Sequence, residues 1–197
     1  MQNEPLALRS FFRSTGGAVA LATLVAFFPN ELSAAPRAAK SRGATQEPIP
    51  SNWTHVRPQS REAGLLVDFA ADASPLVAKL LDDLEQSDVV VYLTDSMPGV
   101  FTGASSSLRF VTTEGSTRYL MIRVDFMRLL ASDRVVALGH ELQHALEIAA
   151  APGVREEIHI ADLYRRIGWE ASPDRFESDA AQATSRAVRR ELGRRDE

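Results

Sequence analysis

The sequence predicts an α+β domain in which a small, mainly antiparallel sheet packs against one helix and two further helices follow. Three runs rich in β-branched and aromatic residues come close together, at 89–94, 108–113 and 118–124. Beyond them, apolar residues recur with helical spacing in three successive segments. Strands gathered ahead of helices are typical of the α+β class.

The first helix expected along the chain begins at Ser74-Pro75. A serine can cap a helix, and proline is favoured in the first turn because the amide hydrogen it lacks would be unpaired there. The apolar residues that follow share one helix face and are Leu76, Val77, Leu80, Leu81 and Leu84. We expect this helix to end near Ser87, just before the first strand.

The second and third strands are separated by a turn sequence at 113–116, Thr-Glu-Gly-Ser, and should form an antiparallel hairpin. The period then changes, and Ser132-Asp133 can cap a helix that Pro152-Gly153 would stop. Two more helical patterns cover 154–167 and 173–192. The last pattern starts with acidic residues and ends with arginines, as the helix dipole favours.

The N-terminus has the pattern of an export signal. Arg9 and Arg13 precede an apolar stretch at 16–28, and small residues suitable for cleavage follow at 33–35. We therefore expect a signal peptide over 1–35, a flexible linker over 36–60 and a folded domain over 61–197, exported to the periplasm or the outside of the cell. The alternative is a membrane anchor that stays uncleaved, although the stretch is shorter than the roughly 20 apolar residues that span a bilayer.

Composition narrows the chemistry further. A chain of 197 residues with 45% hydrophobic content suits one domain, and its formal net charge of -4 argues against nucleic acid as a partner. Cysteine is absent, which excludes disulfides, thiolate ligands and cysteine nucleophiles. Any metal ion must therefore be held by histidines and carboxylates.

The helix expected after the strands contains the segment 140–144, His-Glu-Leu-Gln-His. Histidines four residues apart lie on one helix face, so His140 and His144 can both reach one tetrahedral zinc ion. Glu141 is rotated by about 100 degrees from His140, where its carboxylate could take a proton from a metal-bound water. The alternative is a pair of packed core histidines with Glu141 in a surface ion pair. Gly139, just before the motif, marks a place where the sheet could approach the helix.

This motif resembles that of the zincin superfamily of metallopeptidases. In the metzincin branch it continues through a glycine and a third histidine, but Glu147 and Ala150 occupy those positions here. In the gluzincin branch the third ligand is a glutamate from a later helix, and the segment 176–181, Phe-Glu-Ser-Asp-Ala-Ala, looks like that second motif. The resemblance implies that Glu177 is the third zinc ligand and that Ala180 lets two helices approach each other.

The sequence departs from the gluzincin pattern at one position. Gluzincins commonly carry an acid four residues after the glutamate ligand, where it orients a metal-bound histidine, and this chain has Ala181 there. A second carboxylate must come from elsewhere or be missing. The rivals of Glu177 as third ligand are Glu157, Asp162 and Asp179.

His159 and Tyr164 lie in the helix expected between the two motifs. Either side chain could hydrogen-bond the oxyanion of a tetrahedral intermediate, as imidazoles and phenols do in several peptidases, or could simply pack. Zincins also bind extended peptides along a sheet edge beside the motif helix, and the strand at 118–124 closely precedes that helix. This strand could equally lie in the interior of the sheet.

Together these features predict an exported zinc metallopeptidase with one Zn²⁺ ion, held by His140, His144 and Glu177, and with Glu141 as general base. Its partner would be a peptide or protein substrate, and a membrane would be involved only through an uncleaved N-terminal segment. The alternative is a catalytically silent zincin-like module that binds peptides or proteins at the cell envelope. The missing acid at position 181 is the reason to keep that alternative.

Overall fold

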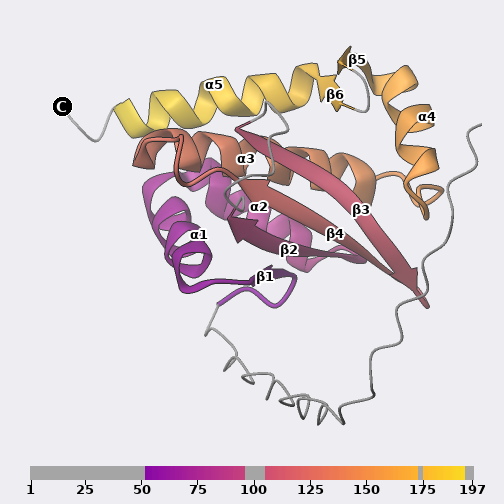
Figure 1. Cartoon of the computed structure of the whole chain (residues 1–197), viewed down its shortest axis with the longest axis horizontal. Helices are drawn as coiled ribbons and strands as arrows, with labels where there is room; N and C mark the ends of the chain where they lie inside the picture. Colours follow the sequence, from indigo (N-terminus) through magenta and orange to yellow (C-terminus); the bar gives the residue numbers. More distant parts are fainter. Residues whose placement is uncertain (1–51, 96–104, 173–174, 194–197) are drawn as a thin grey trace, which may run out of the picture. The chain divides into compact units, whose positions relative to one another are not determined.

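The computed structural model describes residues 52–95, 105–172 and 175–193, and within them five helices and six strands (Figure 1). The expected signal peptide over 1–35 and most of the expected linker lie outside the described residues. The mixture of helices and sheet confirms the α+β class. Among the described helices, none has both the length and the apolar character that crossing a membrane requires.

The main sheet has four strands in the order β1-β2-β4-β3, formed by β1 (Val56–Pro58), β2 (Val89–Asp95), β4 (Thr117–Val124) and β3 (Ser106–Glu114). The expected hairpin is present, because β3 and β4 pair antiparallel around a turn at Gly115, whose φ is 59°. The pairs β1–β2 and β2–β4 are both parallel, so the sheet is mixed rather than mainly antiparallel. The strand at 118–124 is interior, and the edge beside the motif helix is β3.

The first strand was not expected, because it lies in the segment that we predicted to be a linker. Val56 is fully buried and pairs with Val91 of β2, so the folded unit includes residues ahead of Arg61. A strand of three residues carries too short a pattern to be recognised without its partner.

Side chains of β4 alternate strictly between the two faces of the sheet, as the period of a strand requires. Arg118, Leu120, Ile122 and Val124 are buried, whereas Tyr119, Met121 and Arg123 are partly exposed. The buried set joins a single hydrophobic core with the helices, which lie together on one face of the sheet (Figure 1). The opposite face is left open by the described helices.

Two helices precede the main strands, α1 (Arg61–Ala73) and α2 (Pro75–Glu85). The expected cap of α2 is confirmed, since the Ser74 side chain accepts a hydrogen bond from Val77 N at 3.1 Å and Pro75 stands in the first turn. Ser60 caps α1 in the same way through Ala63 N.

The helix that bears the motif is α3 (Ala131–Ala149). It begins one residue before the expected cap: Leu130 is the N-cap residue, and no side chain caps the helix, so Ser132 and Asp133 lie in its first turn. A Cβ on Gly139 would lie 3.1 Å from Val188 and 3.3 Å from Val77. Gly139 therefore admits neighbouring helices to α3, rather than the sheet.

The C-terminal region differs most from expectation. The helix α4 (Ile158–Ile167) starts four residues late, and the helix α5 (Asp179–Gly193) starts six residues late. Between them lies an unexpected antiparallel hairpin of β5 (Gly168–Ser172) and β6 (Arg175–Ser178). Ser178 accepts a hydrogen bond from Ala181 N at 3.0 Å, as a helix cap does, so α5 begins directly after the hairpin.

Arg118 ties α3 to the sheet through a fully buried guanidinium group. The group donates to the carbonyl oxygens of Ile148 and Ala149 at 2.6 and 3.0 Å, at the C-terminal end of α3, and to that of Ala151 at 2.9 Å. It also pairs with both carboxylate oxygens of Asp88, and this hydrogen bonding lowers the pKa of Asp88. The last carbonyls of a helix have no partner within it, so Arg118 satisfies groups that burial would otherwise leave unpaired.

Replacing this arginine should strongly destabilise the fold. We expect Arg118→Met to lower the free energy of unfolding by roughly 3 kcal/mol, because several buried carbonyls lose their donor at once. Urea titration followed by circular dichroism would measure the change. Arg123→Met, on the open face of the same strand, is the matched control and should change stability by less than about 0.5 kcal/mol. Equal effects of the two substitutions would contradict this role for Arg118.

Candidate metal centre

The motif histidines project from the same side of α3. Their ring centroids are 4.7 Å apart and the rings are nearly perpendicular. His144 is buried, and the side chain of His140 is 19% exposed at the edge of a cleft. The core side of α3 carries Val135, Leu138, Leu142 and Ala145, so helical packing fixes the direction in which both imidazoles point.

Glu177 of β6 meets the two imidazoles. Its Oε1 lies 3.5 Å from His140 Nε2 and 3.6 Å from His144 Nε2. The carboxylate is oriented locally, because the same oxygen accepts a hydrogen bond from Ser178 N at 2.9 Å. Glu177 was expected on a helix, but it lies in the short strand β6, two residues before α5 begins.

The rival carboxylates do not join this group. Within the described part of the chain, the one set of three metal-binding side chains whose ligand atoms all lie within 4.8 Å of one another is His140, His144 and Glu177. Asp162 instead pairs with Arg165 on the surface. Glu157 borders the cleft at an exposed position, and Asp179 is exposed at the start of α5.

The three side chains fit a metal ion. A tetrahedral ion with bonds of roughly 2.0–2.1 Å needs ligand atoms about 3.4 Å apart, which is close to the separations from Glu177 to both histidines. His144 Nε2 is a buried nitrogen without a hydrogen-bond partner, although buried polar atoms are ordinarily satisfied. Two imidazole nitrogens and a carboxylate oxygen are donors that zinc accepts, so this group can hold a metal ion.

Glu147, one helical turn after His144, connects the surrounding elements. Its Oε2 lies 2.8 Å from His144 Nδ1 and accepts a hydrogen bond from the Tyr164 hydroxyl of α4 at 3.0 Å. Its Oε1 accepts one from the Ser178 hydroxyl at 2.5 Å. Because a carboxylate only accepts, Nδ1 of His144 carries the hydrogen, and a neutral ring then presents the lone pair of Nε2 toward Glu177.

These contacts shift the pKa of both partners. Burial alone would lower the pKa of His144, but Glu147 and Glu177 outweigh it and raise the pKa to about 9. Burial would raise the pKa of Glu147, and the hydrogen bonds from His144, Ser178 and Tyr164 lower it instead. A metal ion at Nε2 of His144 would therefore displace a proton at neutral pH.

Glu147 supplies the carboxylate that seemed to be missing at position 181. Ala181 itself is fully buried in the packing of α5, where a carboxylate would be left without water. Ala180 was expected to let two helices approach each other, but it is exposed. The alanine of α5 that is buried here is Ala181. His140 has a different partner, since its Nδ1 lies 2.9 Å from the Ser185 hydroxyl of α5.

Of these supporting residues, sequence reasoning missed Glu147, Ser178 and Ser185. Glu147 could have been recognised from the sequence, because a carboxylate three residues after His144 lies on the same helix face. Ser178 could have been found as a cap for the last helix. Nothing local in the sequence distinguishes Ser185 from other surface serines.

Tyr164 and His159 were expected as oxyanion or substrate contacts. The Tyr164 hydroxyl lies 2.8 Å from His144 Nδ1, on the side of the ring away from Glu177, and the residue is 2% exposed. This placement favours support of the histidine over contact with a substrate. His159 does not border the cleft, and its Nδ1 accepts a hydrogen bond from Arg155 N at 3.3 Å.

Gly168 fixes the position of Glu177 by having no side chain. A Cβ on Gly168 would lie only 2.0 Å from the backbone oxygen of Glu177, the residue just before Ser178, which is the partner of Gly168 across the hairpin. The Cβ position is fixed by the backbone of β5 and the oxygen belongs to the backbone of β6, so the clash could be relieved only by separating the two strands. The hairpin thus holds the third side chain of the group at a distance that only glycine allows.

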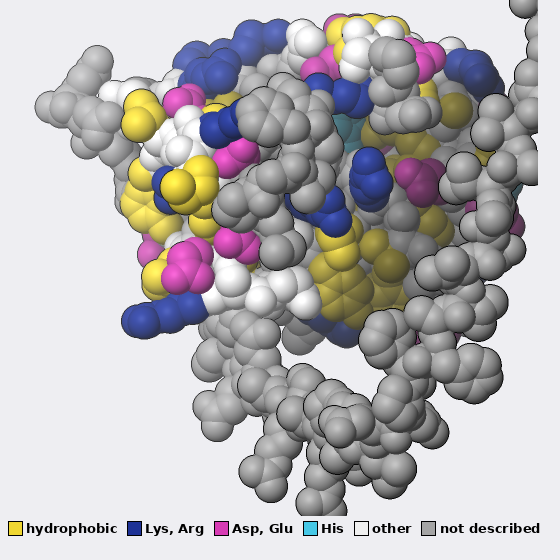
Figure 2. Space-filling model, in the orientation of Figure 1, with side chains coloured by type: hydrophobic (Ala, Val, Ile, Leu, Met, Phe, Trp, Pro, Cys, Tyr) yellow, Lys and Arg dark blue, Asp and Glu magenta, His cyan; other side chains and the backbone are white. Residues whose placement is uncertain are grey.

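The group lies in a cleft of about 980 Å³, which is visible as a hollow with histidine at its base (Figure 2). Residues 105–109, at the start of β3, form one wall of the cleft and α3 forms its floor. The opposite wall consists of residues from α4, the β5–β6 hairpin and α5. Glu141 lies at the cleft floor, is only 6% exposed and is not one of the three grouped side chains. Burial raises the pKa of Glu141, and the two histidines and the Ser106 hydroxyl oppose that shift.

Comparisons with protein-family models, with curated proteins and with solved structures gave no match. The resemblance to zincins therefore rests on the two sequence motifs, and the structure adds that His140, His144 and Glu177 come together.

A methyl group at position 168 should disturb the site from a distance. We expect Gly168→Ala to push β6 away and to weaken binding of Zn²⁺ or Co²⁺ at least tenfold, because the Glu177 carboxylate moves with its strand. Competition with a chromophoric chelator would measure the affinity. Gly153→Ala is the control, since a Cβ there would meet nothing within 4 Å. Unchanged affinity in Gly168→Ala would show that the hairpin does not position Glu177.

Loss of the Glu147 charge should act on His144. We expect Glu147→Gln to weaken metal binding about 10- to 100-fold, because a neutral amide replaces the charged acceptor that orients the ring and raises its basicity toward a metal ion. The same chelator competition applies, with Glu156→Gln, an exposed residue that does not border the cleft, as control. An affinity equal to that of the control would mean that Glu147 serves stability alone.

Proposed function

We propose that this chain is a zinc-dependent metallopeptidase, in which His140, His144 and Glu177 hold the ion and Glu141 is the general base. The observation that carries the proposal is the convergence of these four side chains in one cleft. Three of them form a metal-binding group with near-tetrahedral spacing, and the fourth, next to His140 in sequence, stays outside that group. A purely structural metal site would need no such buried free carboxylate.

A bound zinc ion would supply Lewis-acid chemistry, lowering the pKa of water to about 7 and polarising a carbonyl group. Glu141 would accept a proton from the attacking water and pass it to the nitrogen of the amide bond as that bond breaks. Its raised pKa suits this exchange, because the carboxylate takes up a proton readily and the carboxylic acid can give it back. Glu147 and Tyr164 would hold the His144 ring in place throughout.

The wall of the cleft suits an extended polypeptide. In the described part of the chain, β3 pairs only with β4, so the backbone groups on its other edge have no partner strand. A peptide could add to this edge as a further strand and so cross the cleft above α3. Ser106, whose hydroxyl is near Glu141, would place such a backbone close to the general base.

The alternative of a catalytically silent binding module had its support in the alanine at position 181. Glu147 now offers the carboxylate that the alanine does not, so this reason for expecting an inactive site is weaker. The peptidase and the binding module would use the same three metal-binding side chains. They differ in whether Glu141 acts as a general base.

Substitution of Glu141 distinguishes the peptidase from the silent binding module. We expect Glu141→Gln to keep one metal ion per chain and to lower the rate of peptide hydrolysis by roughly 10²- to 10⁴-fold, because only the proton acceptor is lost. Hydrolysis would be followed with a fluorogenic peptide library, and metal content by mass spectrometry of the purified protein.

Two histidine variants complete the comparison. His140→Ala should lose both the metal and the activity, whereas His159→Ala, outside the cleft, should keep both. A wild-type protein that binds one zinc ion and cleaves no peptide in the library would overturn the peptidase and leave the binding module.

A further inference from the structure

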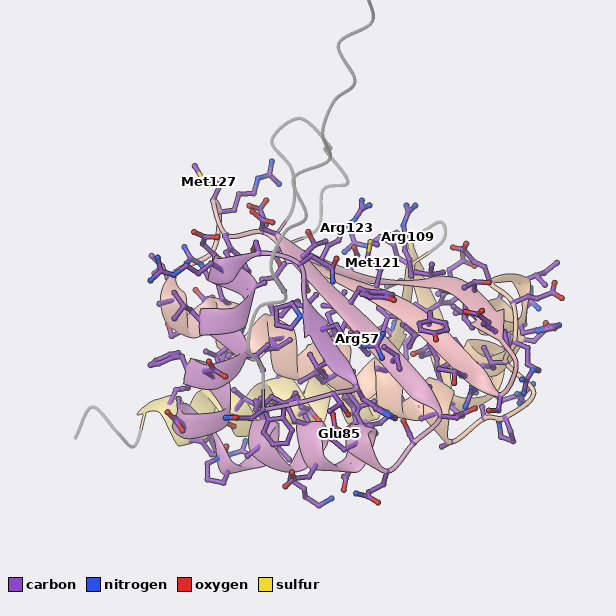
Figure 3. The ribbon with its side chains drawn as sticks, turned by 90° about the horizontal axis from the view of Figure 1, so that it is seen from below. Arg57, Glu85, Arg109, Met121, Arg123 and Met127 are labelled. Atoms are coloured by element: carbon purple, nitrogen blue, oxygen red, sulfur yellow. The ribbon has the colours of Figure 1, made fainter. Side chains whose placement is uncertain are left out.

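The open face of the sheet carries a row of side chains that runs across all four strands. Arg57 of β1 is opposite Tyr92 of β2, Tyr92 is opposite Met121 of β4, and Met121 is opposite Arg109 of β3. Arg123 stands on the same face of β4, two residues after Met121. Figure 3 shows Arg109, Met121 and Arg123 close together on the side of the sheet away from the helices.

The three arginines give this face a positive charge. Arg57 and Arg109 are exposed and Arg123 is partly exposed. Within residues 52–95, 105–172 and 175–193, none of them forms an ion pair, and the Nε of Arg57 donates only to the Thr54 carbonyl. The acidic residue that shares the face is Glu114, at the far hairpin end of β3. Neighbouring strands lie about 4.8 Å apart, so the row places its terminal arginines roughly 15 Å from each other.

Two tyrosines lie between the arginines. The rings of Tyr92 and Tyr119 are stacked with centroids 6.0 Å apart and an angle of 14° between their planes. Each ring therefore covers one face of the other. Tyrosine, methionine and arginine are among the residues enriched at protein interfaces, where they supply contact area and hydrogen bonds together.

We propose that this face, defined by Arg57, Tyr92, Arg109, Met121 and Arg123, is a docking surface for an acidic polypeptide segment of a partner protein. Guanidinium groups bind carboxylates through paired hydrogen bonds, and the spacing along the row matches an extended segment with acids a few residues apart. The tyrosine hydroxyls and the Met121 side chain would contact the backbone between those acids.

Nucleic acid fits this surface less well. Base stacking needs exposed ring faces, and Tyr92 and Tyr119 each lose one of their two faces to the other ring. The chain as a whole has a net charge of -4, which opposes the approach of a long polyanion. An acidic peptide carries its charge locally and needs only the arginines of the row.

The surface continues into the cleft. Arg109 belongs to the row and also borders the cleft, because β3 is the strand at the edge of the sheet. A partner held on the open face would therefore lie beside the candidate metal centre, although its binding uses none of the residues of that centre.

A binding assay tests the surface independently of catalysis. The probe is a fluorescein-labelled octaglutamate peptide, followed by fluorescence anisotropy in the Glu141→Gln background, where hydrolysis does not interfere. We expect saturable binding that weakens as sodium chloride is raised, because exposed charges are screened. Arg109→Gln together with Arg123→Gln should lower the affinity about tenfold, and Arg166→Gln, an exposed arginine of α4, should change it less than twofold.

The outcomes distinguish an acidic peptide from nucleic acid as the partner. They also distinguish failure of the docking surface from failure of the proposed peptidase. Absence of saturable octaglutamate binding, or an equal loss in the Arg166 control, overturns the docking surface. Tighter binding of a labelled octathymidylate than of octaglutamate overturns it in favour of nucleic acid. A chain that binds the peptide as expected but hydrolyses nothing upholds the surface while the proposed peptidase fails, and His140→Ala should bind the peptide as the parent does.

Discussion

The site depends on the carboxylate of Glu147 more than on any other single group. It draws together the three parts of the structure that build the centre: α3 through His144, α4 through Tyr164 and the start of α5 through Ser178. A buried carboxylate is stable only when its oxygens are satisfied, and here each partner comes from a different element. The requirement of one side chain for hydrogen bonds thus becomes a constraint on how three elements are placed.

The other end of this arrangement is anchored by Arg118. Its guanidinium group, on β4, holds the C-terminal carbonyls of α3 against the sheet. Gly139 performs the complementary task by letting α2 and α5 approach α3 closely. Together these two contacts fix how α3, which forms the floor of the cleft, packs in the core.

Local sequence patterns correctly predicted the features that depend on interactions between neighbouring residues. The helical spacing of the histidines, the cap at Ser74 and the hairpin around Gly115 all follow from neighbouring residues, and all are present. The parallel pairing of β2 with β4 was not predictable, because chain order does not show that β3 lies outside β4. The second strand of the C-terminal hairpin, β6, fell within the helix predicted over 173–192, since its acids and small residues suit either structure. What Glu147 contacts depends on Tyr164 and Ser178, whose positions only the complete fold determines.

The close contact at Gly168 has a consequence for how a bound ion would leave. Glu177 belongs to a hairpin of only two strands, and such ribbons are marginally stable on their own. His140 and His144, in contrast, stand on a helix embedded in the core. The candidate ligands therefore join a half embedded in the core to a half on a short ribbon, which Ser178 ties to Glu147 of α3. A bound ion would accordingly lose Glu177 before either histidine, once local opening had broken the contact between Ser178 and Glu147.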